Sequence, residues 1–217
     1  MPNSVILEDI PYKTYLRLRG VRANRHTPMS YNNGTPEILG SDNTFGRERA
    51  MVKMDMLVRA VGTETGIGWT GTGKATFHRG GDGPRKGKGR ERGQSYYLAH
   101  ARGLSGREAV DLDAADPPPD LWIEVDHRAD ASLRLPVCAG LAVPEVWQYR
   151  VGPNSLRFLR LVDRRYRRID RSVALSMLTP ALVLDALKLS PGQTDDVPDR
   201  RLRAWARESL PSSAPEA

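Results

Sequence analysis

The sequence predicts a mixed α/β domain, and three local patterns carry this expectation. The segment DLWIEVD at 120–126 alternates apolar and polar residues, which is typical of a β-strand. Residues 46–61 repeat apolar side chains at helical spacing, which indicates an amphipathic helix. Asn33-Gly34, between two short runs, indicates a β-hairpin because both residues tolerate a positive φ.

The N-terminal half supplies the hairpin, two helices and a glycine-rich segment. We expect a strand at 4–8, a helix at 11–19, hairpin strands at 28–31 and 35–39, the helix at 46–61 and an extended run at 67–77. Residues 79–93 read RGGDGPRKGKGRERG, with six glycines and six basic residues. Such a composition predicts a mobile loop that contributes no core.

The C-terminal half supplies most of the predicted strands. Strands are expected at 95–100, 109–112, 120–126, 146–151, 156–162 and 166–169, and a helix at 132–141. Thr179-Pro180 predicts the start of a helix that runs to residue 189, because proline suits the first helical position. The predicted organisation is one domain over 1–190, followed at 191–217 by a linker, a short basic helix and a frayed end.

Composition limits the classes of protein that remain. The 217 residues include 33 Lys and Arg against 26 Asp and Glu, a net charge of +7, which favours a polyanionic partner. A single cysteine, Cys138, excludes an internal disulfide and a cysteine-based zinc site, and suits the reducing cytoplasm. No apolar run reaches the roughly 18–20 residues of a membrane span, so no membrane partner is expected. The sequence leaves a homodimer open.

Two acidic residues of the alternating strand form the candidate chemical site. Glu124 and Asp126 are two residues apart and therefore share a strand face, about 7 Å apart. Two carboxylates on one face can hold a hard divalent cation through their oxygens. The alternative is a polar, solvent-facing strand edge. Asp120 shares the face but lies about 13 Å from Glu124, too far to reach the same ion.

Several motifs in a consistent order resemble a known family. PPPDLWIEVD, LRLP and AVPEVWQYRV are similar to the PPDLVIEI and GVPEVW motifs of the Uma group of restriction endonucleases, within the PD-(D/E)xK nuclease superfamily. SYNNGTPEIL, GRERAMVKMDMLVRAV, GKATFHR and ERGQSYYLA resemble the group's upstream hairpin, helix and strand motifs. The resemblance covers about residues 5 to 190.

The resemblance implies a fold, an activity and a set of site residues. The fold would be a restriction-endonuclease-like core, a mixed central sheet flanked by helices. The activity would be metal-dependent hydrolysis of DNA phosphodiesters, with Mg²⁺ or Mn²⁺ polarising the phosphate. Glu124, Asp126 and Glu48 would hold the metal. Arg134, where the group carries a lysine, would complete the catalytic set at the rim of a pocket on which Glu48 and Glu124 converge.

The chain also departs from the family pattern. Gly93 stands where the group has a metal-binding aspartate, and Arg134 cannot act as a base because it does not lose its proton. Two alternatives follow. Either Glu91 or Asp126 completes the metal site, or the chain has lost catalysis and is a nucleic-acid-binding or interaction protein.

Two basic segments are candidates for contact with DNA phosphates. In the first, at 79–93, the expected phosphate ligands are Arg85, Lys86, Lys88 and Arg90. The second, at 157–171, holds seven arginines. Phosphate contacts would make binding strongly salt-dependent. The alternative for both segments is ordinary solvated charge.

Overall fold

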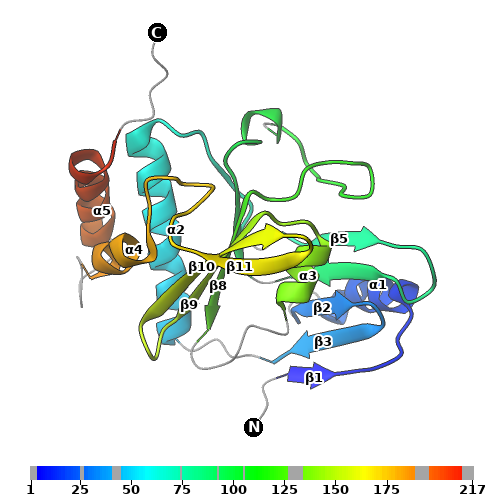
Figure 1. Cartoon of the computed structure of the whole chain (residues 1–217). Coiled ribbons are helices and arrows are strands. Elements are labelled where there is room, and N and C mark those ends of the chain that lie inside the picture. The colour runs from blue at the N-terminus through cyan, green and yellow to red at the C-terminus, as the bar shows by residue number, and fades with distance from the viewer. Residues whose placement is uncertain are drawn as a thin grey trace.

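The computed structural model describes residues 4–24, 27–40, 45–73, 75–91, 93–104, 106–126, 134–188 and 196–211. This part of the chain forms two β-sheets and five α-helices, so the predicted mixed α/β class is confirmed. Helices α2, α4 and α5 cover one side of the six-stranded sheet, and α3 and the five-stranded sheet lie on its other side (Figure 1).

The larger sheet contains the acidic strand near its middle. Its order is β11-β10-β9-β8-β7-β4, with β8 and β9 parallel and the other neighbours antiparallel. The parallel pair is joined through α3, Leu135–Gly140. The strands are β4 Thr70–Gly71, β7 Gln94–Tyr97, β8 Leu121–Asp126, β9 Glu145–Arg150, β10 Ser155–Val162 and β11 Arg165–Ile169.

The smaller sheet is antiparallel and contains the predicted hairpin. Its order is β1-β3-β2-β6-β5. Asn33 and Gly34 join β2 to β3 with φ values of 47° and 97°, as expected for a tight hairpin turn. The strands are β1 Ser4–Ile6, β2 Met29–Asn32, β3 Thr35–Leu39, β5 Phe77–Gly80 and β6 Gly87–Arg90.

The helices bury the apolar stripes that predicted them. α1 spans Tyr12–Gly20, and α2 spans Phe45–Thr65, longer than predicted, with Met54, Leu57, Val58 and Val61 fully buried. α4, Pro180–Leu187, begins after Thr179, whose hydroxyl accepts a hydrogen bond from the Leu182 amide. α5, Asp196–Ser209, packs on α2 through Leu202 and Ala206.

One predicted strand is absent, and other predicted segments cannot be compared. Residues 109–112 form no strand, because this segment is a loop stabilised by Asp116, which accepts a hydrogen bond from the Asp111 amide. The start of the predicted helix at 132, most of the linker at 191–195 and the end at 212–217 lie outside the described residues. None of the described helices is long and apolar enough to cross a membrane.

The prediction of a mobile loop at 79–93 is wrong. β5 and β6 pair with each other as far as Gly80 and Gly87, and β6 also pairs with β2 inside the sheet. The glycines of β6 are required by packing, because Tyr15 of α1 lies directly against the backbone. A Cβ atom added at Gly89 would lie 2.3 Å from the Tyr15 hydroxyl oxygen. Close approach of a ring, rather than flexibility, explains these glycines.

Candidate functional site

Strand β8 alternates apolar and polar residues as predicted. It is not the solvent-facing strand edge that was the alternative to a metal site. Its apolar residues face the core formed with α2, and Trp122 belongs to the core on the opposite face. All six residues of β8 are buried, because the strand lies between β7 and β9 and both of its faces are covered. The idea of a polar strand edge is therefore wrong.

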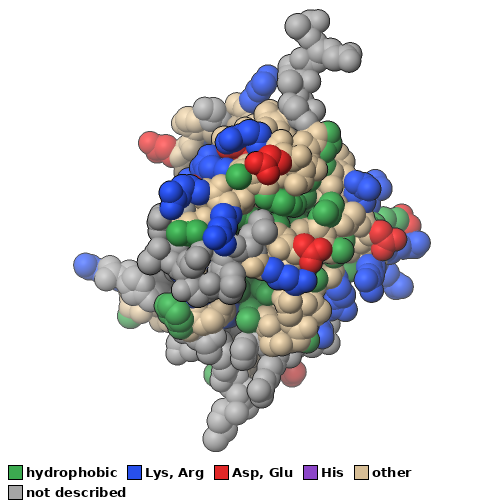
Figure 2. Space-filling model, turned by 90° about the vertical axis from the view of Figure 1, so that its left-hand side faces the viewer, with side chains coloured by type: hydrophobic (Ala, Val, Ile, Leu, Met, Phe, Trp, Pro, Cys, Tyr) green, Lys and Arg blue, Asp and Glu red, His purple; other side chains and the backbone are tan. Residues whose placement is uncertain are grey.

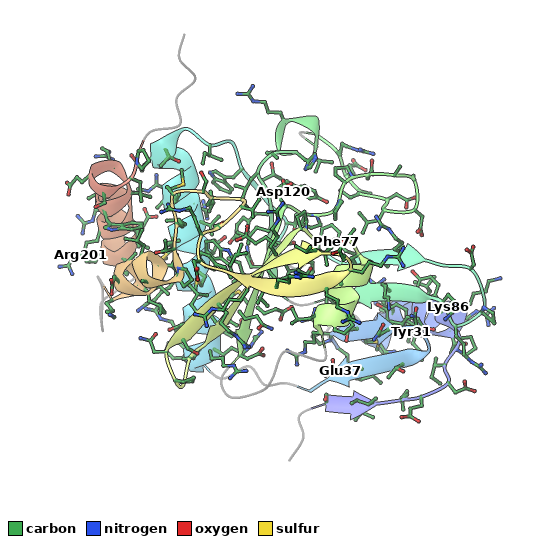
Figure 3. All side chains as sticks on the ribbon, viewed as in Figure 1. Tyr31, Glu37, Phe77, Lys86, Asp120 and Arg201 are labelled. Atoms are coloured by element: carbon green, nitrogen blue, oxygen red, sulfur yellow. The ribbon has the colours of Figure 1, made fainter. Side chains whose placement is uncertain are left out.

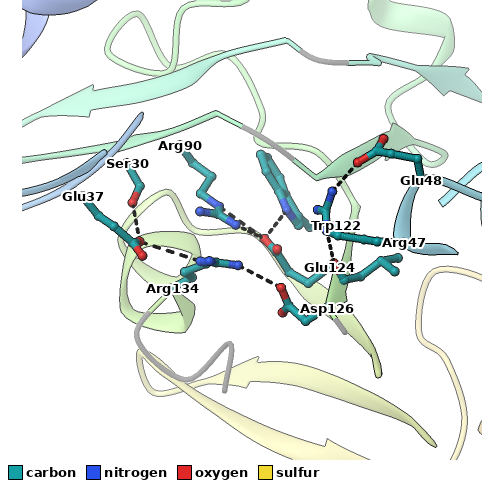
Figure 4. A network of polar contacts seen from close by, with 10 residues as sticks. Ser30, Glu37, Arg47, Glu48, Arg90, Trp122, Glu124, Asp126 and Arg134 are labelled. Carbon is teal, nitrogen blue, oxygen red and sulfur yellow. Dashed lines mark hydrogen bonds and ion pairs between the residues drawn. The ribbon is translucent and has the colours of Figure 1, made fainter. Parts of the chain in front are cut away.

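The Glu124 carboxylate is buried and already has a cationic partner. Glu124 is 2% exposed, and its Oε1 atom accepts hydrogen bonds from Arg90 Nη2 at 2.5 Å and Nε at 3.2 Å. The same oxygen accepts a bond from Trp122 Nε1 at 2.8 Å (Figure 4). Arg90 has no exposed surface. A charge buried this deeply is tolerated only when it is paired and hydrogen-bonded. Glu124 meets both conditions, whereas Nη1 of Arg90 is buried without a hydrogen-bond partner among the described residues.

Asp126 faces a second arginine. Its Oδ1 atom accepts a hydrogen bond from Arg134 Nη1 at 3.1 Å, and Arg134 Nε lies 3.7 Å from Oε2 of Glu37. That Glu37 oxygen also accepts a hydrogen bond from the Ser30 hydroxyl at 3.1 Å (Figure 4). Burial and then the charge of Glu124 raise the pKa of Asp126 above its ordinary value, against the opposing effect of Arg134.

The two arginines connect the acidic strand to the smaller sheet. Arg90 extends from β6 of that sheet to Glu124 on β8. Arg134, which directly precedes α3, lies between Glu37 on β3 and Asp126 on β8. The candidate site is thus a buried polar layer between two sheets, in which both acidic residues of β8 contact guanidinium groups.

Glu48 does not join this layer. Its side chain is 43% exposed, and its Oε1 atom lies 2.6 Å from Arg47 Nη1. Its neighbour Arg47 makes the polar contact between α2 and β8, because its Nε donates to the Val125 carbonyl oxygen at 2.7 Å. Glu48 and Glu124 therefore have different guanidinium partners, and the expected convergence of the two carboxylates is not found (Figure 4).

The room for an acidic side chain at position 93 is filled by Trp122. Gly93 has a φ of +113°, and a Cβ atom added there would lie 2.3 Å from Trp122 Nε1. An L-residue would be strained by this backbone conformation and would displace the indole. Glu91, the suggested replacement, pairs with Arg19 of α1 and accepts a hydrogen bond from the Met29 amide at 3.1 Å. Its contacts are with α1 and β2.

These contacts do not fit a site for Mg²⁺ or Mn²⁺. Such ions need several free carboxylate or carbonyl oxygens around one point. Within the described ranges, no group of three or more His, Cys, Asp or Glu side chains is placed to hold a metal ion. Instead, positively charged side chains contact Glu124 and Asp126 and supply the charge compensation that a metal would give.

The four basic residues predicted to bind phosphate lie in unlike environments. Arg85 is exposed and pairs with Asp9 at 2.7 Å, and Lys86 is exposed near the outer end of the β5–β6 hairpin (Figure 3). Lys88 is half-buried beside Asn32, and burial lowers the pKa of its ammonium group. Arg90 is internal. The prediction that Arg90 binds phosphate is therefore wrong, because no solvent reaches its side chain.

Sequence reasoning missed four members of the polar layer, which are Ser30, Glu37, Arg47 and Trp122. Trp122 was detectable, because the alternation of β8 puts it on the face of Glu124. Ser30 and Glu37 become neighbours through hairpin pairing, which the Asn-Gly turn could have indicated. Nothing in the local sequence marks Arg47 rather than Glu48 as the residue that reaches β8.

Comparison with known proteins adds no assignment. No protein-family model matches the chain, and no curated protein shows significant similarity to it.

Proposed function

We propose that this protein is a non-catalytic nucleic-acid-binding protein on a restriction-endonuclease-like fold. The observation that carries the proposal is the Glu124 carboxylate, one oxygen of which accepts bonds from Arg90 and Trp122 in the interior. A carboxylate in this state would have to lose a buried ion pair before it could bind a metal, and breaking such a pair costs about 3–5 kcal/mol.

The proposed fold relation is supported by the arrangement around β8. A helix, α2, packs on one face of β8, and the parallel neighbour β9 follows after α3. This is a mixed central sheet with flanking helices, as the motif resemblance implies. The nucleic-acid part of the proposal is supported by the net charge of +7 and by the exposed arginines of β10 and β11.

A second candidate function, a metal-dependent endonuclease, is favoured by Asp126. Evolution toward stability alone would not favour a buried carboxylate whose pKa is raised by burial and by a neighbouring acid. In this alternative Arg90 would have to leave Glu124, so that Glu124 and Asp126 could bind Mn²⁺ together. Among the described residues of the polar layer, Glu37 would stay with Arg134.

Calorimetric titration with Mn²⁺ separates the two candidates. The proposal predicts no binding heat that depends on Glu124, so the wild type and Glu124→Gln should give the same trace. Duplex DNA binding, followed by fluorescence anisotropy, should be unchanged by EDTA, and supercoiled plasmid should stay intact with Mn²⁺. Saturable Mn²⁺ binding that Glu124→Gln abolishes, together with plasmid nicking, would establish the endonuclease instead.

A further inference from the structure

The hairpin of β10 and β11 carries a cluster of exposed basic side chains. Strand β11 is the outermost strand of the larger sheet, so one of its edges is unpaired. Six arginines in and beside these two strands are exposed, against two acidic residues, Asp163 and Asp170. The six are Arg160, Arg164, Arg165, Arg167, Arg168 and Arg171.

The hairpin presents these arginines on a well-fixed support. Asp163 and Arg164 form its turn with φ values of 49° and 62°, the pair of positive values that a tight two-residue turn requires. Phe158 is fully buried, and the Tyr166 hydroxyl donates to the Val143 carbonyl oxygen at 2.7 Å. The apolar side chains therefore anchor both strands, and the charged ones extend into solvent.

The register puts like charges side by side. Arg160 lies directly opposite Arg167, and Arg165, two residues from Arg167, is on the same face. Direct opposition of like charges destabilises a strand pair. Among the described residues, these three arginines have one acidic contact, in which Asp163 lies 4.0 Å from Arg167. Both groups are largely exposed, so this contact is too weak to compensate. In the part of the chain that the structure describes, the guanidinium groups of Arg160 and Arg165 have no polar partner.

A neighbouring acid does not explain the cluster either. Glu145 lies opposite Arg160 on β9, but it is fully buried, and its oxygens accept bonds from Trp147 Nε1 and the amides of Val173 and Ala174. Protection of the sheet edge from aggregation needs only charged side chains, of either sign. It does not require two arginines to face each other across the strand pair.

We infer that Arg160, Arg165 and Arg167 bind the phosphate backbone of duplex DNA, an inference that rests on the proposed function. A backbone with regularly spaced phosphates is the partner that turns the mutual repulsion of the three guanidinium groups into binding energy. The hairpin offers no free aromatic ring for stacking of unpaired bases, because Tyr166 is partly buried and hydrogen-bonded. A duplex therefore suits it better than a single strand.

Other described surfaces fit a large partner less well. Figure 2 looks onto the side of α4 and α5, where hydrophobic side chains (green) form separate spots among Lys and Arg (blue) rather than one continuous patch. On α5, Arg203 and Arg207 already pair with Glu64 of α2. On the hairpin, six arginines face solvent together.

The test compares two triple variants of equal charge in the full chain. The first is Arg160→Gln, Arg165→Gln and Arg167→Gln. The control is Lys13→Gln, Arg17→Gln and Arg22→Gln, which removes three exposed positive charges from α1 and the short turn that follows it. Fluorescence anisotropy with a mixed-sequence duplex is measured between 50 and 200 mM NaCl. Melting temperatures should stay within about 2 °C of wild type for both variants, since all six side chains are exposed.

The hairpin variant should bind about 10- to 100-fold more weakly, with the slope of log K against log salt reduced by about 2 to 3. The control should keep most of the slope. An unchanged slope in the hairpin variant, with the loss in the control, overturns the inference and leaves DNA binding intact. A wild type that binds no duplex overturns the proposed function itself. Binding to single-stranded DNA or to phosphatidylserine vesicles, but not to duplex, also overturns the inference.

Discussion

The two arginine-rich segments of this chain have similar charge and opposite positions. Residues 79–93 hold six basic and two acidic residues, and residues 157–171 hold seven arginines and two aspartates. In the first segment, Arg90 is fully buried between the two sheets. In the second, most of the arginines face solvent on an edge hairpin.

The surroundings of the two strands explain this difference. In β6 glycines alternate with the basic residues, and their bare face accepts the rings of Tyr12 and Tyr15. The basic face of β6 is therefore directed toward β8 and α3, where Arg90 meets Glu124. In β10, Leu156 and Phe158 are buried on the same face as Arg160, whereas Arg160, nearer the hairpin turn and opposite Arg167, is exposed. Charge count alone cannot predict exposure, because burial depends on which part of a strand the neighbouring elements cover.

The largest expected effect is on the buried side of this comparison. Arg90→Met leaves the Glu124 carboxylate buried without its cation, and we expect a loss of about 3–5 kcal/mol in the free energy of unfolding. Adding Glu124→Gln should restore most of the loss, because the amide oxygen still accepts the Trp122 indole N–H without carrying charge. Urea unfolding of the wild type, both single variants and the double variant measures this coupling.

The matched control on the exposed side is Arg165→Met. Its side chain lies in solvent, so the free energy of unfolding should change by no more than about 0.5 kcal/mol. A loss below about 1 kcal/mol for Arg90→Met would contradict the assignment of Arg90 to the interior.

Sequence reasoning went furthest where a pattern has one structural solution. The alternation at Leu121–Asp126, the Asn33-Gly34 turn and the helix at Thr179-Pro180 all fall where predicted. It failed at 79–93, because RGGDGPRKGKGRERG by itself gives no sign of the Tyr12 and Tyr15 rings that pack on its glycines. For the site, it found both acids of β8. It could not find their partners, since the approach of β6 and β3 to β8 depends on how two separate sheets pack.

Glycine packing offers the next test. Gly89→Ala adds a methyl group 2.3 Å from the Tyr15 hydroxyl oxygen, and Tyr15 is fully buried against Tyr31 with ring centroids 4.8 Å apart. Since the ring has little room to move, we expect a loss of about 1–3 kcal/mol in urea unfolding. Gly68→Ala is the control, because a Cβ atom there has no neighbour within 4 Å. Equal stability of the two variants would mean that β6 is a loose loop after all.

The buried layer should also have a distinctive pH dependence. The pKa of Asp126 is raised in the folded state, so folding favours its protonated form. Its contribution to stability is present below the unfolded value near 3.8 and is lost as pH rises through the folded value.

Asp126→Asn removes this titration. The free energy of unfolding of the wild type, relative to Asp126→Asn, should therefore fall as pH is raised from about 4 toward 7, with a constant offset from the lost contact to Arg134. Chemical unfolding at several pH values measures the difference. Parallel profiles would contradict the raised pKa, and a rise with pH would mean that Arg134 outweighs burial.

The smallest effect is expected on the exposed hairpin, where stability and binding should change in opposite directions. Arg167→Glu replaces the repulsion between Arg160 and Arg167 with an attraction across the strand pair, which is worth about 0.2–1 kcal/mol. The lost contact with Asp163, at 4.0 Å and largely exposed, should cost little.

Arg165→Glu is the control, because Val162 rather than an arginine lies opposite it. Urea unfolding at low salt should show a gain for Arg167→Glu beyond that of Arg165→Glu, and 1 M NaCl should remove most of the difference by screening. Both variants should bind duplex DNA more weakly than wild type. A hairpin that gains stability and loses affinity through the same substitution is one whose arginines are placed for a ligand. If Arg167→Glu is no more stable than Arg165→Glu, the facing arginines do not repel, and the argument that an anion must relieve them is lost.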